Sequence, residues 1–182
     1  MENERQQEFQ DLRPDPASVQ ARILQNRHPV ALLLDGVQDP RNLGLLFRLA
    51  DAARLREVLL WNLPAEEPGT KARRIARSTV DYVPHRHLQD WAELDDLQSY
   101  YQLVALEYTN KSMPYDQFVP KKPVLLVVGS EVAGISPNML ERVEQSIHIP
   151  MFGMNTSMNV SCATAIASYA LIRFFSKNPM AI

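Results

Sequence analysis

The chain has little cysteine, no long uninterrupted apolar run and no excess of charge of one sign. Its single cysteine, Cys162, can form neither an intramolecular disulfide nor a cysteine zinc site, so the reducing cytoplasm is the expected compartment. The most apolar stretch, 162–175, is interrupted by Ser168 and Arg173 and is too short to span a membrane. Nineteen basic and 21 acidic residues give a net charge of −2, which argues against binding nucleic acid through bulk charge.

Several signature motifs are absent as well. No G-x-G-x-x-G occurs, so a dinucleotide site is not predicted. Gly129 and Gly134 have the spacing of a phosphate loop, but Ile135-Ser136 stands where Lys-Ser/Thr would follow, which disfavours a nucleoside triphosphatase. The four histidines show no H-x-x-x-H spacing, and no metal site is predicted. The first 16 residues are polar and charged, so no secretory signal is expected there.

What remains is the composition of one globular domain, with 46% hydrophobic and 22% charged residues among 182. Residues 1–28 carry charge of both signs, Pro14 and Pro16, and a short helical pattern. We therefore expect an N-terminal helical appendage over 1–28 and a single domain over 29–182.

From Val30 onward, short β-rich runs alternate with segments of helical period, which is typical of an α/β fold with a mostly parallel sheet flanked by helices. Ligands of such sheets bind at the carboxyl ends of the strands. The aliphatic runs predict strands that are buried on both faces. The predicted strands are 30–34, 57–61, 101–106, 124–128 and 147–149, and the predicted helices are 42–53, 70–77, 88–97, 137–143 and 159–175. Cys162, in the last helix, is expected to be a small buried residue.

The loop after the first strand, 35–44, and the helix that follows it carry two polar residues of interest. Asn42 is either an N-cap that starts a helix or a site residue. Arg48 lies between Phe47 and Leu49 in a strongly apolar helix. It is either a solvated helix residue or a guanidinium aimed at a phosphate near the strand ends, and both readings stay open.

Two further loops follow later strands. The glycine-bounded turn 129–136 carries one carboxylate, Glu131, which alone is more often a solvated acid than a catalytic one. The run 149–161 combines methionines with small hydroxyl and amide residues at a helix N-terminus, whose free N–H groups are hydrogen-bond donors. Capping by Ser157 or Asn159 explains one residue of this run but not the whole.

Together, these three loops resemble the three ordered motifs of the SpoU/TrmH family of RNA ribose methyltransferases, within the SPOUT superfamily. The resemblance covers about residues 29–176. The matching stretches are Asp39-Pro40-x-Asn42-x-Gly44 with Arg48, then Gly129-Ser130-Glu131-x-x-Gly134-Ile135-Ser136, and last Ile149-Pro150-Met151-x-Gly153 with Ser157-Met158-Asn159-Val160-Ser161.

The resemblance implies a deep C-terminal trefoil knot, S-adenosylmethionine as cofactor, an RNA substrate and a homodimer whose sites lie near the subunit interface. The residues it places at the cofactor are Leu106, Gly129, Ser130, Gly134, Ile149, Met151 and Met158. It assigns catalysis to Arg48, with Asn42, Glu131, Ser157 and Asn159 orienting Arg48, the ribose and the loops. An arginine pKa above about 12 favours Arg48 as a phosphate clamp and oxyanion stabiliser, while a role as general base stays open.

The segment 71–78 holds four basic residues and is our first candidate for contact with the RNA backbone. The expected RNA-binding residues are Arg41, Arg48, Lys71, Arg73, Arg74 and Arg77. The chain departs from the family at Met158, where leucine is common, and near Arg54, where glycine is usual. A left-handed backbone at Arg54 would therefore be costly.

These features predict an S-adenosylmethionine-dependent RNA 2′-O-methyltransferase. By analogy with short members of the family, the favoured substrate is a guanosine ribose in tRNA, and the alternative substrate is rRNA. A non-catalytic RNA-binding knotted dimer is the rival from another functional class. A base methyltransferase of another knotted family is disfavoured by the Ser-x-Asn run.

Overall fold

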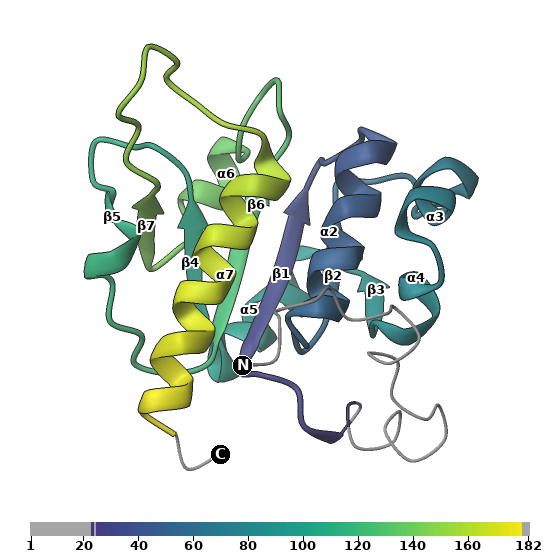
Figure 1. Ribbon diagram of the computed structural model, residues 1–182, viewed down its shortest axis with the longest axis horizontal. Helices are drawn as coiled ribbons and strands as arrows, with labels where there is room; N and C mark the ends of the chain where they lie inside the picture. Colours follow the sequence, from purple (N-terminus) through teal and green to yellow (C-terminus); the bar gives the residue numbers. More distant parts are fainter. Residues whose placement is uncertain (1–22, 24, 180–182) are drawn as a thin grey trace, which may run out of the picture.

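Two aliphatic strands lie at the centre of the sheet in the computed structural model, which describes residue 23 and residues 25–179 (Figure 1). β1 (Val30–Asp35) and β6 (Val124–Gly129) pair in parallel along their whole length, and every residue of both is buried. Valine and leucine fill these strands because helices cover both faces of the sheet. The predicted burial on both faces is confirmed.

Seven strands form one sheet in the order β3-β2-β1-β6-β4-β7-β5, and all neighbouring strands are parallel. The predicted α/β fold with a parallel sheet and flanking helices is therefore confirmed. The remaining elements are α2 (Pro40–Ala52), β2 (Val58–Trp61), α3 (Thr70–Ala76), α4 (Thr79–Tyr82), β3 (His85–His87), α5 (Trp91–Tyr100), β4 (Gln102–Leu106), β5 (Met113–Pro114), a 3-10 turn η1 (Tyr115–Gln117), α6 (Pro137–Leu140), β7 (Gln145–His148) and α7 (Val160–Lys177).

Successive residues of β1 point to opposite faces of the sheet and enter two separate cores. Leu32 and Leu34 pack with α2 and α7, whereas Ala31 and Leu33 pack with α5 and α6. Figure 1 shows α2 and α7 side by side in front of the sheet, with α5 behind it. The front layer places α2, which carries the first motif, next to α7, which follows the third.

The predicted elements are all present, with shifted ends. α5 begins at Trp91 rather than Leu88, because the Asp90 carboxylate accepts the Glu93 N–H and so caps the helix. α6 ends at Leu140, short of the predicted Val143. The predicted appendage over 1–28 lies almost wholly outside the described residues.

Four short elements were not predicted: β3, β5, α4 and the 3-10 turn η1. β3 and β5 are edge strands of three and two residues, too short to show an apolar alternation.

Two further expectations concern single residues, Arg54 and Cys162. Arg54 does adopt a left-handed backbone, with φ of 45°. The expected burial of Cys162 is wrong: the residue is exposed, because it lies in the first turn of α7 on the side away from the sheet core.

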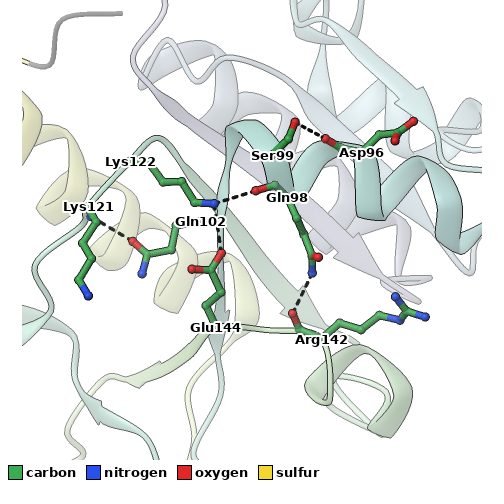
Figure 2. Close-up of polar contacts among 8 residues, drawn as sticks. All are labelled: Asp96, Gln98, Ser99, Gln102, Lys121, Lys122, Arg142 and Glu144. Carbon is green, nitrogen blue, oxygen red and sulfur yellow. Dashed lines mark hydrogen bonds and ion pairs between the residues drawn. The ribbon is translucent and has the colours of Figure 1, made fainter.

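The amino-terminal end of the sheet is closed by polar contacts (Figure 2). The Lys122 ammonium donates to the carbonyl of Gln98 at 2.7 Å and pairs with Glu144 at 3.4 Å. The Gln98 side chain in turn donates to the carbonyl of Arg142 at 3.0 Å. These contacts join α5 to the segments entering β6 and β7, and they leave the opposite, carboxyl-terminal end free for a ligand.

Close contact between α2 and α3 requires a glycine at position 44. A Cβ added to Gly44 would lie 2.8 Å from both the Ala72 carbonyl oxygen and the Ile75 Cβ. Since the first of these is a backbone atom, the two helices would have to separate.

We expect Gly44→Ala to lower the free energy of unfolding by about 1–3 kcal/mol, the usual cost of overpacking. Urea denaturation of the purified protein measures this change. Gly153→Ala is the matched control, because a Cβ there meets no atom within 4 Å. Equal unfolding midpoints for the two variants would contradict the proposed helix contact.

Candidate functional site

A cavity of about 520 Å³ opens at the carboxyl ends of β4, β6 and β7 and at the N-terminus of α7. In an all-parallel sheet the carboxyl ends of the strands meet at one edge, so residues distant in sequence converge there. The lining residues are Leu106, Glu107, Tyr108, Gly129, Ser130, Glu131, Gly134, His148, Ile149, Met151, Thr156, Ser157, Met158, Asn159, Val160 and Ala163.

All seven residues expected at the cofactor lie on this cavity wall, and so do three of the five expected catalytic residues, Glu131, Ser157 and Asn159. The fold thus brings the second and third motifs together around one space. The roles of these residues stay predictions, but their convergence is a property of the structure.

The glycine-bounded turn of the second motif closes on itself rather than around a phosphate. Ser130 and Gly134 exchange two backbone hydrogen bonds, of 2.9 and 3.2 Å. A Cβ on Gly129 would lie 2.0 Å from the Gly134 carbonyl carbon, so position 129 accepts no side chain. Gly134 itself has a φ of 66°, which glycine adopts without strain.

Asn42 is not the cap of α2, as one reading of the sequence held. Asp39 caps the helix by accepting the N–H groups of Arg41 and Asn42. Asn42 lies inside the first turn, only 6% exposed, and its side chain is directed to the other two motifs. Its Nδ2 donates to Glu131 Oε1, and its Oδ1 accepts from Asn159 Nδ2 at 2.8 Å.

The Glu131 carboxylate determines the direction of this hydrogen-bond chain. An ionised carboxylate only accepts, so the Asn42 amide must present its NH₂ to Glu131 and its oxygen to Asn159. Asn159 then donates through its own NH₂, and its oxygen is left to accept the N–H groups of Ser161 (2.9 Å) and Cys162 (3.4 Å). One chain of hydrogen bonds therefore links all three motifs and caps α7 with Asn159.

Arg48 is exposed and does not line the cavity. It shares one stripe of α2 with Arg41 and Leu45, since exposed residues recur at positions 41, 45, 48 and 52. The structure therefore places the guanidinium expected to act in catalysis on the exposed side of α2 and not among the loops that line the cavity.

The basic helix α3 packs against α2. Lys71, Arg74 and Arg77 are exposed, as expected for residues that contact RNA. Arg73 is also exposed, but it forms an ion pair with Asp81 at 3.5 Å and donates to the Pro68 carbonyl at 2.9 Å. It is thus the only one of the four held by contacts within the protein in the part of the chain that the structure describes.

Sequence reasoning missed three polar or aromatic residues of the cavity wall. Glu107 and Tyr108 follow β4, and His148 ends β7; the rings of Tyr108 and His148 lie 4.6 Å apart. Glu107 Oε2 accepts the Ile135 N–H at 3.3 Å. Their position directly at strand ends was the signal that could have identified them.

Residues 23 and 25–179 contain neither a metal-binding cluster nor a helix that could span a membrane. No group of three or more His, Cys, Asp or Glu side chains that could hold a metal ion occurs there. Within the same residues no helix has the length and hydropathy needed to cross a membrane.

Comparison with known proteins identifies the arrangement. A sequence profile of the SpoU rRNA Methylase family matches residues 29–169. A 23S rRNA (guanosine(2553)-2′-O)-methyltransferase of Bacillus subtilis is 34% identical over 142 residues, which are 77% of this chain and 56% of the relative. The chain spans 56–63% of the length of the first curated relatives it matches.

Two solved structures share the fold. A TrmH/SpoU tRNA modifying enzyme of A. aeolicus has a TM-score of 0.79 at 25% identity, covering 88% of this chain and 82% of its own. An AdoMet-bound rRNA methyltransferase from Sinorhizobium meliloti has a TM-score of 0.73 at 27% identity, covering 82% of this chain and 59% of its own. The resemblance inferred from the three motifs is confirmed, and the chain belongs to the SpoU rRNA methylase family.

Proposed function

We propose that this chain binds S-adenosylmethionine in the cavity and transfers its methyl group to a ribose 2′-hydroxyl of RNA. The observation that carries the proposal is the make-up of the cavity wall: it contains two carboxylates, Glu107 and Glu131, and no lysine or arginine. Such a wall does not suit a phosphate-bearing nucleotide. It suits a phosphate-free adenosine derivative with a cationic sulfonium, and a family neighbour is described as AdoMet-bound.

The residues of the wall fit such a ligand. Leu106, Ile149, Met151 and Met158 offer apolar surface, while Gly129 leaves the backbone without side-chain cover. The bound cofactor would supply an electrophilic methyl group. The chain's own part is to hold the loops and the RNA in a reactive orientation, which can supply most of the catalysis.

Arg48 would act from outside the cavity. A guanidinium on the exposed stripe of α2 is placed to bind an RNA phosphate and to stabilise the negative charge that develops on the ribose oxygen. The hydrogen-bond chain from Glu131 through Asn42 to Asn159 keeps α2 in register with the cavity loops. Ser157, on the same wall, would orient the ribose.

Arg41, Arg48 and the basic residues of α3 would bind the RNA backbone. They lie on two adjacent helices in a protein of net charge −2, so the positive charge is local rather than general. For the substrate we propose ribosomal RNA, methylated on a guanosine, because the first curated relatives are named as 23S rRNA guanosine methyltransferases. The tRNA expected from the resemblance becomes the alternative, supported by the neighbour described as a tRNA modifying enzyme.

The proposal includes a knotted homodimer in the cytoplasm. Support for the knot comes from α7, which packs on the central strands β1, β4 and β6 although it follows β7, a strand outside them. Support for the dimer comes from exposed apolar side chains on two adjacent helices: Leu45 (40% exposed) on α2 and Ile166 (38%) and Tyr169 (52%) on α7. The exposed thiol of Cys162 suits the reducing compartment expected from composition.

We expect Arg48→Ala to reduce methyl transfer at least 100-fold, the usual effect of losing a group that stabilises transition-state charge. Radiolabelled S-adenosylmethionine with separately purified rRNA and tRNA measures transfer, and calorimetric titration should show cofactor affinity within threefold of the wild type. Arg41→Ala is the matched control and should weaken RNA binding without a comparable loss of rate. Retained turnover in Arg48→Ala would refute the assignment. A wild type that binds cofactor and RNA but transfers no methyl group would favour the non-catalytic alternative.

Asn42→Ala removes two side-chain hydrogen bonds from a buried position, so the free energy of unfolding should fall by about 1–3 kcal/mol. Asn42→Asp should be worse than alanine, because it sets a second carboxylate against Glu131. Urea denaturation of both variants tests this order. Asn110→Ala, at an exposed loop position, is the control and should be neutral. An aspartate variant as stable as the wild type would exclude the hydrogen-bond direction deduced above.

For the dimer, Ile166→Glu and Tyr169→Glu should each reduce the mass in sedimentation equilibrium from twice 20.7 kDa toward 20.7 kDa. A charge placed within an apolar interface loses its hydration without gaining a partner. Val119→Glu, at an apolar position that is 64% exposed and outside both helices, should leave the mass unchanged. A wild type that sediments as a monomer at micromolar concentration would eliminate the dimer.

A further inference from the structure

Asp35 is a buried carboxylate at the carboxyl end of β1 that does not line the cavity and is 3% exposed. Each of its oxygens accepts one hydrogen bond: Oδ1 from Asn62 Nδ2 at 2.8 Å, and Oδ2 from the backbone N–H of Ser136 at 2.7 Å. None of the ion pairs formed by the described residues includes it. Two neutral donors are therefore what compensates the loss of hydration of this carboxylate.

The hydrogen bond to Ser136 joins the central sheet to the second-motif turn. Asp35 and Gly129 are register partners in β1 and β6, so the turn leaves the sheet beside Asp35. The turn then closes through the two backbone bonds between Ser130 and Gly134 and returns to the sheet at Ser136. Asp35 thus holds the returning end of a turn whose first half contributes Ser130 and Glu131 to the cavity wall.

The return limb of the turn, residues 133–136, has two other side-chain contacts, both longer: Ser130 Oγ accepts the Ala133 N–H at 3.1 Å, and Glu107 Oε2 accepts the Ile135 N–H at 3.3 Å. The Ser136 side chain forms no cap for α6, and its hydroxyl, although buried, has no partner among the described residues. The bond from the Ser136 N–H to Asp35 is therefore the shortest side-chain contact that fixes this limb.

We infer that Asp35 is a positioning residue of the cofactor site, acting from below the cavity by clamping the 130–136 turn in the shape that presents Ser130 and Glu131. Asn62 donates to the other carboxylate oxygen, Oδ1, and not to the one that accepts the Ser136 N–H. The inference rests on the proposed function only for the identity of the ligand, S-adenosylmethionine.

Two substitutions of similar volume separate the hydrogen bond from packing and from charge. Asp35→Asn removes the charge but keeps an oxygen for Ser136, and its NH₂ can donate to a reoriented Asn62. Asp35→Leu removes both acceptors. We expect Asp35→Leu to raise amide hydrogen exchange across 130–136 and the Kd for S-adenosylmethionine at least tenfold each, and Asp35→Asn to stay within threefold of the wild type in both measurements.

Ser136→Pro removes the donor instead of the acceptor and changes no residue of the buried strand. The φ of −61° at Ser136 is accessible to proline, but the ring carbon replaces the N–H that points at Asp35 Oδ2, so the substitution both removes the bond and displaces the carboxylate. It should raise exchange across 130–135 and the Kd as Asp35→Leu does. Asn62→Gly, which keeps the positive φ of 54° accessible, removes only the second donor and should stay within threefold of the wild type.

Local exchange distinguishes a clamp from general stability, because exchange in the central strand β6 should not rise in parallel. If exchange and Kd in folded Asp35→Leu or Ser136→Pro stay within threefold of the wild type, the inference is overturned. It is likewise overturned if both variants fail to fold, since Asp35 would then stabilise the whole domain. A wild type that does not bind S-adenosylmethionine would refute the proposed function alone, while the exchange measurements would still decide the role of Asp35.

Discussion

The hydrogen-bond chain from Glu131 through Asn42 to Asn159 is the interaction on which the site depends. Its members are 89 and 117 residues apart in sequence, and each belongs to a different motif. Because the carboxylate accepts only, both amides are oriented by it, and the orientation of the last amide caps an 18-residue helix. The start of α7, the first turn of α2 and the turn after β6 are therefore not independent features.

The sequence was informative wherever a local pattern has a local cause. The aliphatic runs of β1 and β6 predict strands covered on both faces, and the helical period between strands predicts the layers that cover them. Edge strands β3 and β5 carry no such pattern, because two or three residues at a sheet margin obey no alternation. The role of Asn42 was not predictable from its neighbours either: an asparagine near a helix start is an ordinary cap, and only the tertiary fold shows that Asp39 has that role.

The residues of the cavity wall likewise fall into those that the sequence predicted and those that it did not. The residues expected from the three motifs all converge on this wall, except Asn42, which is bonded to the wall from α2, and Arg48, which lies on the open face of that helix. Glu107, Tyr108 and His148 come from segments outside the motifs, and only their position at the ends of strands marked them. Charge is partitioned as well, with acids on the cavity wall and the cationic residues on α2 and α3. Under the proposed function, that separation would let one surface bind a cationic ligand while another binds a polyanion.

The absence of a side chain at Gly44 has a consequence beyond stability. It lets α2 and α3 pack backbone against side chain, so the two helix backbones that carry the basic side chains keep a constant separation. Under the proposed function, cations carried by such a pair of helices would bind a polynucleotide through its phosphates and would carry no information about base identity. Selection by such a surface would, under the proposed function, operate on the contour of a folded duplex or loop, which would leave recognition of the nucleotide itself to the cavity mouth.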